Sequence, residues 1–108
     1  MSLDPGFLRD MVASARLALE HLADIPLEQF VSDVKTQDAV LWRLAMIGEA
    51  ANHVTKETRA AIELPWLDVI AQRHVAIHHY RKLQMPRIWS TVRDDLPVLI
   101  ATLERHLP

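Results

Sequence analysis

The segment that decides the fold is KTQDAVLWRLAMIGEAANHV, residues 35–54, which has the pattern of a long buried helix. Its apolar residues recur at three- and four-residue steps, as they do on the inner face of an α-helix. They also form a wide stripe, which predicts a central helix that is buried on more than one side. The stripe consists of Val40, Leu41, Leu44, Ala45, Ile47, Gly48, Ala51 and Val54.

The boundaries of this central helix and its one glycine can also be interpreted. Asp33 or Thr36 can cap its first turn, because both side chains accept hydrogen bonds from free backbone N–H groups. The helix should reach about Val54. Gly48 destabilises the helix by about 1 kcal/mol relative to alanine. We infer that this glycine permits another helix to approach closely.

Helical signals continue on both sides of the central segment. Asp4-Pro5 is typical of an N-cap followed by proline in the first turn, and predicts a helix to about His21 or Leu22. LEQFVSD predicts one or two short turns, and KETRAAIELP a short amphipathic link. A third long helix should start near Pro65 or Trp66, followed by a turn around residues 82–86, a short helix through Trp89, and a last helix capped by Asp94 or Asp95.

Length and composition favour one all-α domain. The chain has 108 residues, enough for a single core, and we expect residues 1–108 to form one domain. With two glycines and no run of alternating apolar and polar residues, a sheet is disfavoured. The prediction is therefore an antiparallel helical bundle with short connections.

Charge and residue usage exclude several functional classes. The formal net charge is -2, so any contact with nucleic acid must come from a local patch. The absence of cysteine excludes disulfides, thiolate metal sites and thiol nucleophiles. No apolar run reaches the roughly 18 residues of a membrane span, and the N-terminus lacks the pattern of a secretory signal. We expect a cytoplasmic protein that does not contact membranes.

Titratable side chains are concentrated in RHVAIHHYRK, residues 73–82. On a helix, His74 and His78 are about 40° apart and share a face, whereas Arg73 and His78 are about 140° apart. Arg73 and His78 could line one groove if the helix packs beside a symmetry mate, or if it loosens before His78. This geometry favours a site at a dimer interface.

Arginine and histidine together can cleave RNA without a metal ion. Histidine exchanges protons near neutral pH, and the arginine guanidinium offers donors suited to phosphate. The imidazole removes the 2′-hydroxyl proton, the oxygen attacks phosphorus, and the guanidinium stabilises the phosphorane. We therefore expect no cofactor.

The motif Arg73-x4-His78-x-Tyr80 resembles the R-x4-H-x-Y motif of the HEPN superfamily, in particular its HepT-like group. The segments KTQDAVLWRLAMIGEAANHV, LPWLDVI and IWSTVRDDLPVLIATLE are similar to segments of the same group, in the same order. The resemblance covers essentially the whole chain.

This resemblance implies a HEPN-like homodimer, or a higher oligomer, in which both subunits border one cleft. It implies a metal-independent ribonuclease toxin with Arg73 and His78 as the catalytic pair. Its implied partner is a small nucleotidyltransferase antitoxin of the minimal (MNT) type, which transfers AMP to Tyr80. Glu49 matches an acidic position that lines the cleft or orients the arginine.

The chain departs from the family pattern at two positions of the motif. His74 replaces an asparagine and His79 replaces a glycine that are common there. We expect both imidazoles to line the cleft, where they could assist catalysis, bind metal or fill space. We expect these changes to affect the substrate and the rate more than the fold.

Other interpretations of the same residues stay open. His74 and His78 have the i, i+4 spacing of zinc ligands, and His79 or His53 could add a third ligand. No acidic ligand is obviously placed, so we expect no native metal centre. The cleft could bind a nucleotide or RNA without cutting it, or the dimer could be purely structural. Three tryptophans are expected as core or interface anchors, and four cations could attract phosphate: Trp42, Trp66 and Trp89, and Arg81, Lys82, Arg87 and Arg93.

Overall fold

The computed structural model describes residues 4–78 and 84–108, and these residues contain helices and loops but no strand. The predicted all-α class is confirmed. The helices are α1 (Asp4–Leu22), α2 (Leu27–Phe30), α3 (Val34–Asn52), α4 (Lys56–Ala61), α5 (Trp66–His78), α6 (Met85–Ser90), the π-helical turn η2 (Thr91–Asp95) and α7 (Leu96–Glu104). No helix in these ranges is long and apolar enough to cross a membrane.

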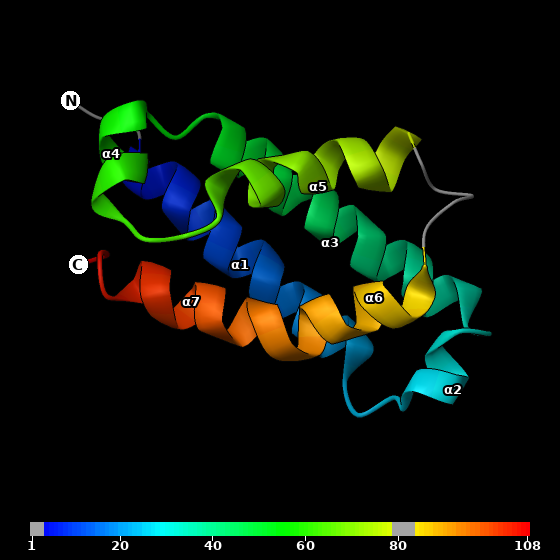
Figure 1. Ribbon diagram of the computed structural model, residues 1–108. Coiled ribbons are helices and arrows are strands. Elements are labelled where there is room, and N and C mark those ends of the chain that lie inside the picture. The colour runs from blue at the N-terminus through cyan, green and yellow to red at the C-terminus, as the bar shows by residue number, and fades with distance from the viewer. Residues whose placement is uncertain (1–3, 79–83) are drawn as a thin grey trace.

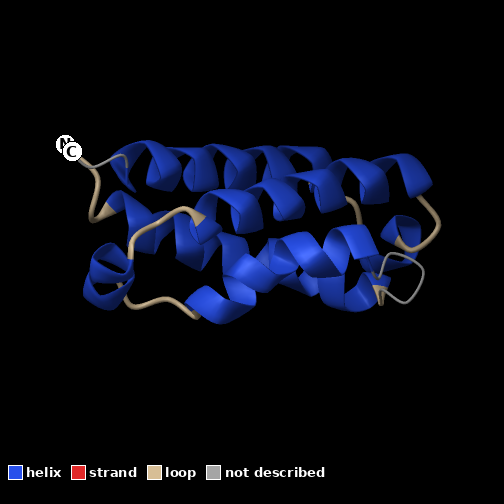
Figure 2. Cartoon of the chain, turned by 90° about the horizontal axis from the view of Figure 1, so that it is seen from above, coloured by secondary structure: helices blue, strands red, loops and turns tan. Residues whose placement is uncertain are grey.

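Helix α3 is the centre of the bundle. Its largest packing interfaces are with α1 and α5, and α1 also packs against α7. The long helices alternate in direction, and the start of α1, the end of α7 and the short helix α4 lie at one end of the molecule (Figure 1). Seen from above, the long helices run nearly side by side (Figure 2). The predicted antiparallel bundle is thus confirmed for one chain.

The core forms because α3 buries apolar side chains on two sides. Each large aliphatic side chain removed from water contributes roughly 1.5–3 kcal/mol before entropy is counted. The wide stripe predicted from the sequence is buried, including Val54, which follows the end of α3. The largest fully buried side chains of the described residues are Phe30, Met11, Leu22, Leu44, Ile47, Leu103, Val40 and Val92.

Asp33 is the N-cap of α3, as the sequence predicted. Its carboxylate accepts hydrogen bonds from the backbone N–H of Thr36 at 3.1 Å and from the Thr36 hydroxyl at 2.7 Å. These two bonds hold the pKa of Asp33 below its usual value of 3.8. The side chain of Gln37 then donates to the carbonyl of Phe30 at 2.8 Å and fixes α2 against the start of α3.

Asp4 connects α1 with α4, a contact that local sequence rules did not indicate. Its buried carboxylate accepts hydrogen bonds from the Thr55 backbone N–H at 3.2 Å, the Thr55 hydroxyl at 2.6 Å and the Thr58 hydroxyl at 2.5 Å. Thr55 is itself the N-cap of α4. The side chain at the start of one helix therefore also anchors the start of another.

The C-terminal region differs from the prediction. A short helix and a separately capped last helix were expected, but α6, η2 and α7 form one continuous helical run, and Asp95 makes no side-chain cap. Pro97 cannot donate a backbone hydrogen bond and would clash in a regular helix. The wider π turn immediately before it accommodates the proline without ending the run.

Gly48 is the point of closest approach between α3 and α5. A Cβ atom at this position would lie 2.7 Å from the backbone nitrogen of Arg73 and 2.9 Å from the backbone oxygen of Ile70. These atoms belong to the main chain of α5 and cannot move aside independently. The prediction that Gly48 permits a close helix–helix approach is confirmed.

Replacing Gly48 with alanine should destabilise the protein although alanine is the better helix former. The gain in helix propensity is about 1 kcal/mol, but forcing α5 away from α3 is an overpacking cost of about 1–3 kcal/mol. Because the added Cβ would meet main-chain atoms, we place the cost in the upper part of this range, at about 2–3 kcal/mol. The expected net loss in the free energy of unfolding, measured by urea denaturation, is therefore about 1–2 kcal/mol.

Gly6→Ala is the matched control, because nothing lies within 4 Å of a Cβ atom built at Gly6. This variant should be neutral or slightly stabilised. A Gly48→Ala protein as stable as the Gly6→Ala protein would show that the close approach does not constrain α5.

Candidate functional site

Arg73 lies on α5 directly above the Gly48 contact, with its side chain directed toward α3. Its Nε atom is 2.7 Å from Oε2 of Glu49, the residue that follows Gly48. The Arg73 side chain is 52% exposed and that of Glu49 41%, so the ion pair is open to solvent. Glu49 therefore contacts the predicted catalytic arginine, as expected of a residue that orients it.

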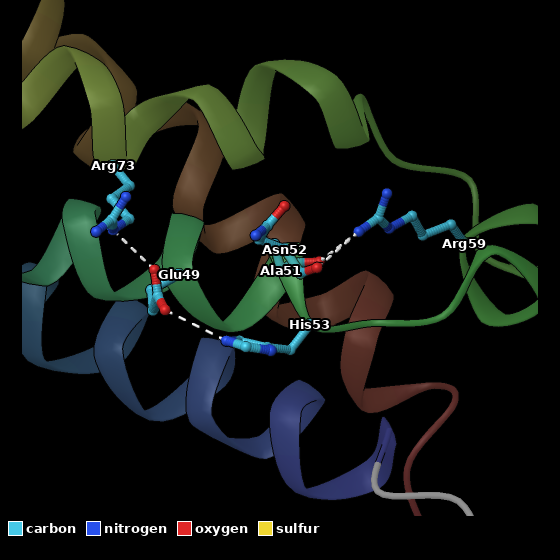
Figure 3. A network of polar contacts seen from close by, with 6 residues as sticks. All are labelled: Glu49, Ala51, Asn52, His53, Arg59 and Arg73. Atoms are coloured by element: carbon cyan, nitrogen blue, oxygen red, sulfur yellow. Dashed lines mark hydrogen bonds and ion pairs between the residues drawn. The ribbon is translucent and has the colours of Figure 1, made fainter.

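The carboxylate of Glu49 bridges two partners. Its other oxygen, Oε1, lies 3.2 Å from Nε2 of His53, one turn further along α3. The His53 ring stacks on Phe7 of α1, with centroids 5.1 Å apart and planes inclined by 21°. Figure 3 shows Glu49 between Arg73 and His53, with the three residues following one another across the surface.

His53 and Phe7 were not predicted as parts of this arrangement. The signal for His53 was present, because a glutamate and a histidine four residues apart face each other on a helix. Phe7 could not be found in this way, since only the packing of α1 on α3 brings it to His53. The same face has a pocket of about 360 Å³ between the two helices, lined in part by Glu49, His53 and Arg43.

Arg59 holds the C-terminal end of α3 in place. Its guanidinium donates hydrogen bonds to the carbonyl oxygens of Ala51 at 3.2 Å and Asn52 at 3.1 Å (Figure 3). A cation at this end is favourable because the last carbonyls of a helix carry partial negative charge. Arg59 thus stabilises the end of the helix that presents Glu49 and His53.

His74 and His78 form a ring pair on α5. Their ring centroids are 4.6 Å apart and their planes are inclined by 37°. Both side chains are exposed. The prediction that these two histidines share a helix face is confirmed.

Arg73 and His78 point in different directions on one chain. Helix α5 continues through His78, so the two positions are about 140° apart around its axis. The alternative in which the helix loosens before His78 is not found. Within one chain, these two side chains therefore do not face one common phosphate-sized gap.

Four predicted positions of the motif region lie outside the described residues. They are the modification site Tyr80, the cleft residue His79, and the cations Arg81 and Lys82.

The remaining predicted cations and tryptophans differ in their surroundings. Arg93 packs against other parts of the fold. Its guanidinium carbon lies 5.3 Å from the ring centroid of Trp89, and its guanidinium N–H donates to the carbonyl of Ile25 at 3.1 Å. Trp89 donates to the same carbonyl at 3.0 Å, and buried Trp66 donates to Ile62 at 2.9 Å. Arg93, Trp66 and Trp89 are therefore structural.

Arg87 and Trp42 remain at the surface. Arg87 is exposed, so it is still available to attract phosphate. Trp42 is 56% exposed and is not part of the core. The prediction that Trp42 anchors the core is therefore wrong, and its role as an interface anchor stays a prediction.

A groove of about 710 Å³ opens between α5 and the α6–α7 run. Leu44 and Ile47 of α3 are among the residues that line it, with Asp68 from α5 and Asp94 and Asp95 from η2. Helix α5 also leaves two large apolar side chains exposed, Leu67 at 81% and Ile77 at 48%, and neither lines this groove.

No three histidine, aspartate or glutamate side chains within residues 4–78 and 84–108 are arranged to hold a metal ion. The groups that gather around α5 are instead a guanidinium, a carboxylate and imidazoles. Such groups bind phosphate and transfer protons.

An all-α bundle that carries an arginine and a histidine five residues apart on one exposed helix has the predicted architecture of a HEPN-type protein. The chain belongs to the HepT-like family: residues 11–106 match the family described as Ribonuclease HepT-like. No solved structure matches the chain significantly.

Three of its relatives have similar lengths and ribonuclease names. The chain is 33% identical to "Probable ribonuclease HepT" of Thermococcus cleftensis over 92% of this chain and 91% of that protein. It is 28% identical to a provisionally named RNase of Methanocaldococcus jannaschii over 92% of each. A third relative, from Caldanaerobacter subterraneus subsp. tengcongensis, is a provisionally named RNase with 29% identity over 86% of this chain and 84% of that protein.

The Glu49–Arg73 pair should contribute little to stability, because solvent screens a pair that is half exposed on both sides. We expect a double-mutant cycle with Glu49→Gln and Arg73→Gln, measured by urea denaturation, to give a coupling of about 0.2–1 kcal/mol. A coupling above about 2 kcal/mol would contradict the assignment, since the pair would then be a structural element of the α3–α5 interface rather than a means of placing a guanidinium.

Proposed function

We propose that this protein is a metal-independent ribonuclease that uses Arg73 and His78. The proposal rests on the position of Arg73, which the α3–α5 contact and Glu49 hold at the surface of a helix that also carries His78. The ribonuclease names of the relatives support the reaction class.

In the proposed reaction, one imidazole nitrogen of His78 takes the proton of an RNA 2′-hydroxyl. The 2′-oxygen attacks the adjacent phosphorus, and the bond to the 5′-oxygen of the next nucleotide breaks. The leaving 5′-oxygen takes a proton from the imidazolium that His78 has become, so the products carry a 2′,3′-cyclic phosphate and a 5′-hydroxyl and His78 returns to its neutral form. Positioned proton transfer of this kind contributes roughly a factor of 10² to 10⁴.

Arg73 stabilises the negative charge of the phosphorane. Glu49 binds the Nε atom of Arg73, which leaves the two terminal nitrogens of the guanidinium available for phosphate oxygens. Glu49 is therefore a positioning residue in this scheme. The contact of Glu49 with His53 further restricts how the carboxylate can turn.

We propose that two chains pair through the exposed side of α5. Pairing can place Arg73 of one protomer across a cleft from His78 of its partner, which the angle between them within one chain does not allow. Covering Leu67 and Ile77, which are largely exposed, would favour association through the hydrophobic effect.

The biological role proposed here is that of a cytoplasmic toxin controlled by a nucleotidyltransferase antitoxin. The antitoxin would transfer AMP from ATP to the Tyr80 hydroxyl and release pyrophosphate. Membership of the HepT-like family supports this part of the proposal. The added phosphate would compete for Arg73 and block the RNA path.

The ribonuclease assignment predicts cleavage of single-stranded RNA by the purified protein in EDTA. Arg73→Ala should lower the rate by about 10²–10³ and His78→Ala by about 10²–10⁴, as measured with a fluorescent oligonucleotide. Arg16→Ala and His21→Ala, both on α1, serve as controls with unchanged rates.

Mixing the two inactive variants tests the shared cleft. A heterodimer of Arg73→Ala and His78→Ala protomers retains one intact composite site, so unfolding and refolding the mixture should restore part of the activity. No restoration would reject pairing in trans. If the wild-type protein and all variants bind RNA but none cleaves it, the result would instead favour a domain that binds RNA without catalysis.

Modification of Tyr80 is tested by co-expression with a nucleotidyltransferase of the minimal type. Intact-mass spectrometry should show one added AMP on the wild-type chain and none on Tyr80→Phe. AMP on another residue, or none on the wild type, would overturn this part of the proposal without affecting the cleavage chemistry.

A further inference from the structure

The ring pair of His74 and His78 has a geometry that the ribonuclease reaction does not require. The two imidazoles project from the same face of α5, one turn apart, with centroids separated by 4.6 Å and planes inclined by 37°. Both are exposed and reachable from solvent. The proposed reaction uses His78 and assigns no part to His74.

We propose that His74 and His78 together bind a soft divalent cation such as Zn²⁺. Imidazole nitrogen is a preferred ligand of Zn²⁺, Ni²⁺ and Cu²⁺. Tetrahedral zinc with Zn–N bonds of about 2.0–2.1 Å needs its two nitrogens about 3.3 Å apart. Ring nitrogens lie away from the centroids, so small side-chain rotations can bring a 4.6 Å ring pair to that separation.

Two histidines four residues apart on one helix can act as a chelate because the backbone already holds them on one face. The helix supplies this arrangement without any folding change. Only the two side-chain torsions of each residue must be fixed, which lowers the entropic cost of binding.

The proposed site is an accessory site and not a cofactor centre. No described residue completes a set of three protein ligands around a metal ion. Structural zinc sites have four protein ligands and catalytic ones three. With only two protein ligands, water must fill the remaining coordination positions, and the cation binds weakly and reversibly.

Occupation of this site would inhibit the enzyme. A metal ion on His78 uses the nitrogen lone pair that must accept the 2′-hydroxyl proton, so the reaction stops while the metal is bound. This regulatory part rests on the proposed function, whereas the binding part rests only on the ring pair.

Metal binding is measured first, by isothermal titration of the purified protein with ZnCl₂ in a chelator-free buffer. His74→Gln and His78→Gln should each weaken binding at least tenfold. His21→Gln and His106→Gln are matched controls, and His53→Gln tests the alternative that Glu49 and His53 hold the ion. Circular dichroism checks that each variant is folded.

The outcomes of the titration separate the possibilities. Loss of binding in both the His74 and the His78 variants, with the controls unchanged, supports the chelate. Unchanged affinity in either variant overturns it, as does loss in His53→Gln alone.

Inhibition is measured second, by RNA cleavage with and without ZnCl₂, each variant being compared with its own zinc-free rate. The wild type should lose at least nine-tenths of its rate and recover it in EDTA, while His74→Gln should resist zinc. Zinc binding without inhibition would overturn the regulatory part alone. A protein that cleaves no RNA would defeat the proposed function, and the titration would still decide the metal site.

Discussion

The contact between Gly48 of α3 and the backbone of α5 is the constraint on which the candidate site depends. A side chain as small as a methyl group at Gly48 would lie 2.7 Å from the Arg73 backbone nitrogen. Because the two main chains meet there, the position of Arg73 relative to α3 is fixed by atoms that cannot rotate away. Glu49 follows Gly48 in the sequence, so the same contact places a carboxylate within 2.7 Å of the guanidinium. The glycine thus determines both the packing of two helices and the placement of a charge.

Around this contact, ion pairs and one ring stack connect three helices at the surface. Arg73 of α5 binds Glu49 of α3, Glu49 contacts His53, and His53 stacks on Phe7 of α1. Each contact is exposed to water and contributes little to the free energy of unfolding. Their effect is positional: they restrict where a guanidinium can lie while the buried core supplies the stability. A site of this kind can exchange its partners for a phosphate without unfolding the bundle.

The two sides of α5 have different chemistry. One side carries Arg73 against α3, and the face shared by His74 and His78 is turned away from it. Two large apolar side chains of the same helix, Leu67 and Ile77, are exposed. In the proposed dimer, a second copy of the chain would bring a histidine to the arginine and cover these side chains. The two proposals together would give the paired imidazoles two uses, proton transfer and the reversible capture of a metal ion.

The sequence by itself determined the helical class, the central position of α3 and the shared face of His74 and His78, and it narrowed the cap of α3 to Asp33 or Thr36. These features follow from periodicity, hydrogen-bonding capacity and helix geometry, which are local properties. Only the tertiary structure decided that Asp4 bonds to Thr55 and Thr58, that His53 stacks on Phe7 and that Arg93 is held by Trp89 and Ile25. It also replaced an expected helix break before Pro97 with a π turn. These contacts join residues that are distant in the chain, or depend on the path of a whole helix, and helix packing sets which side chains meet.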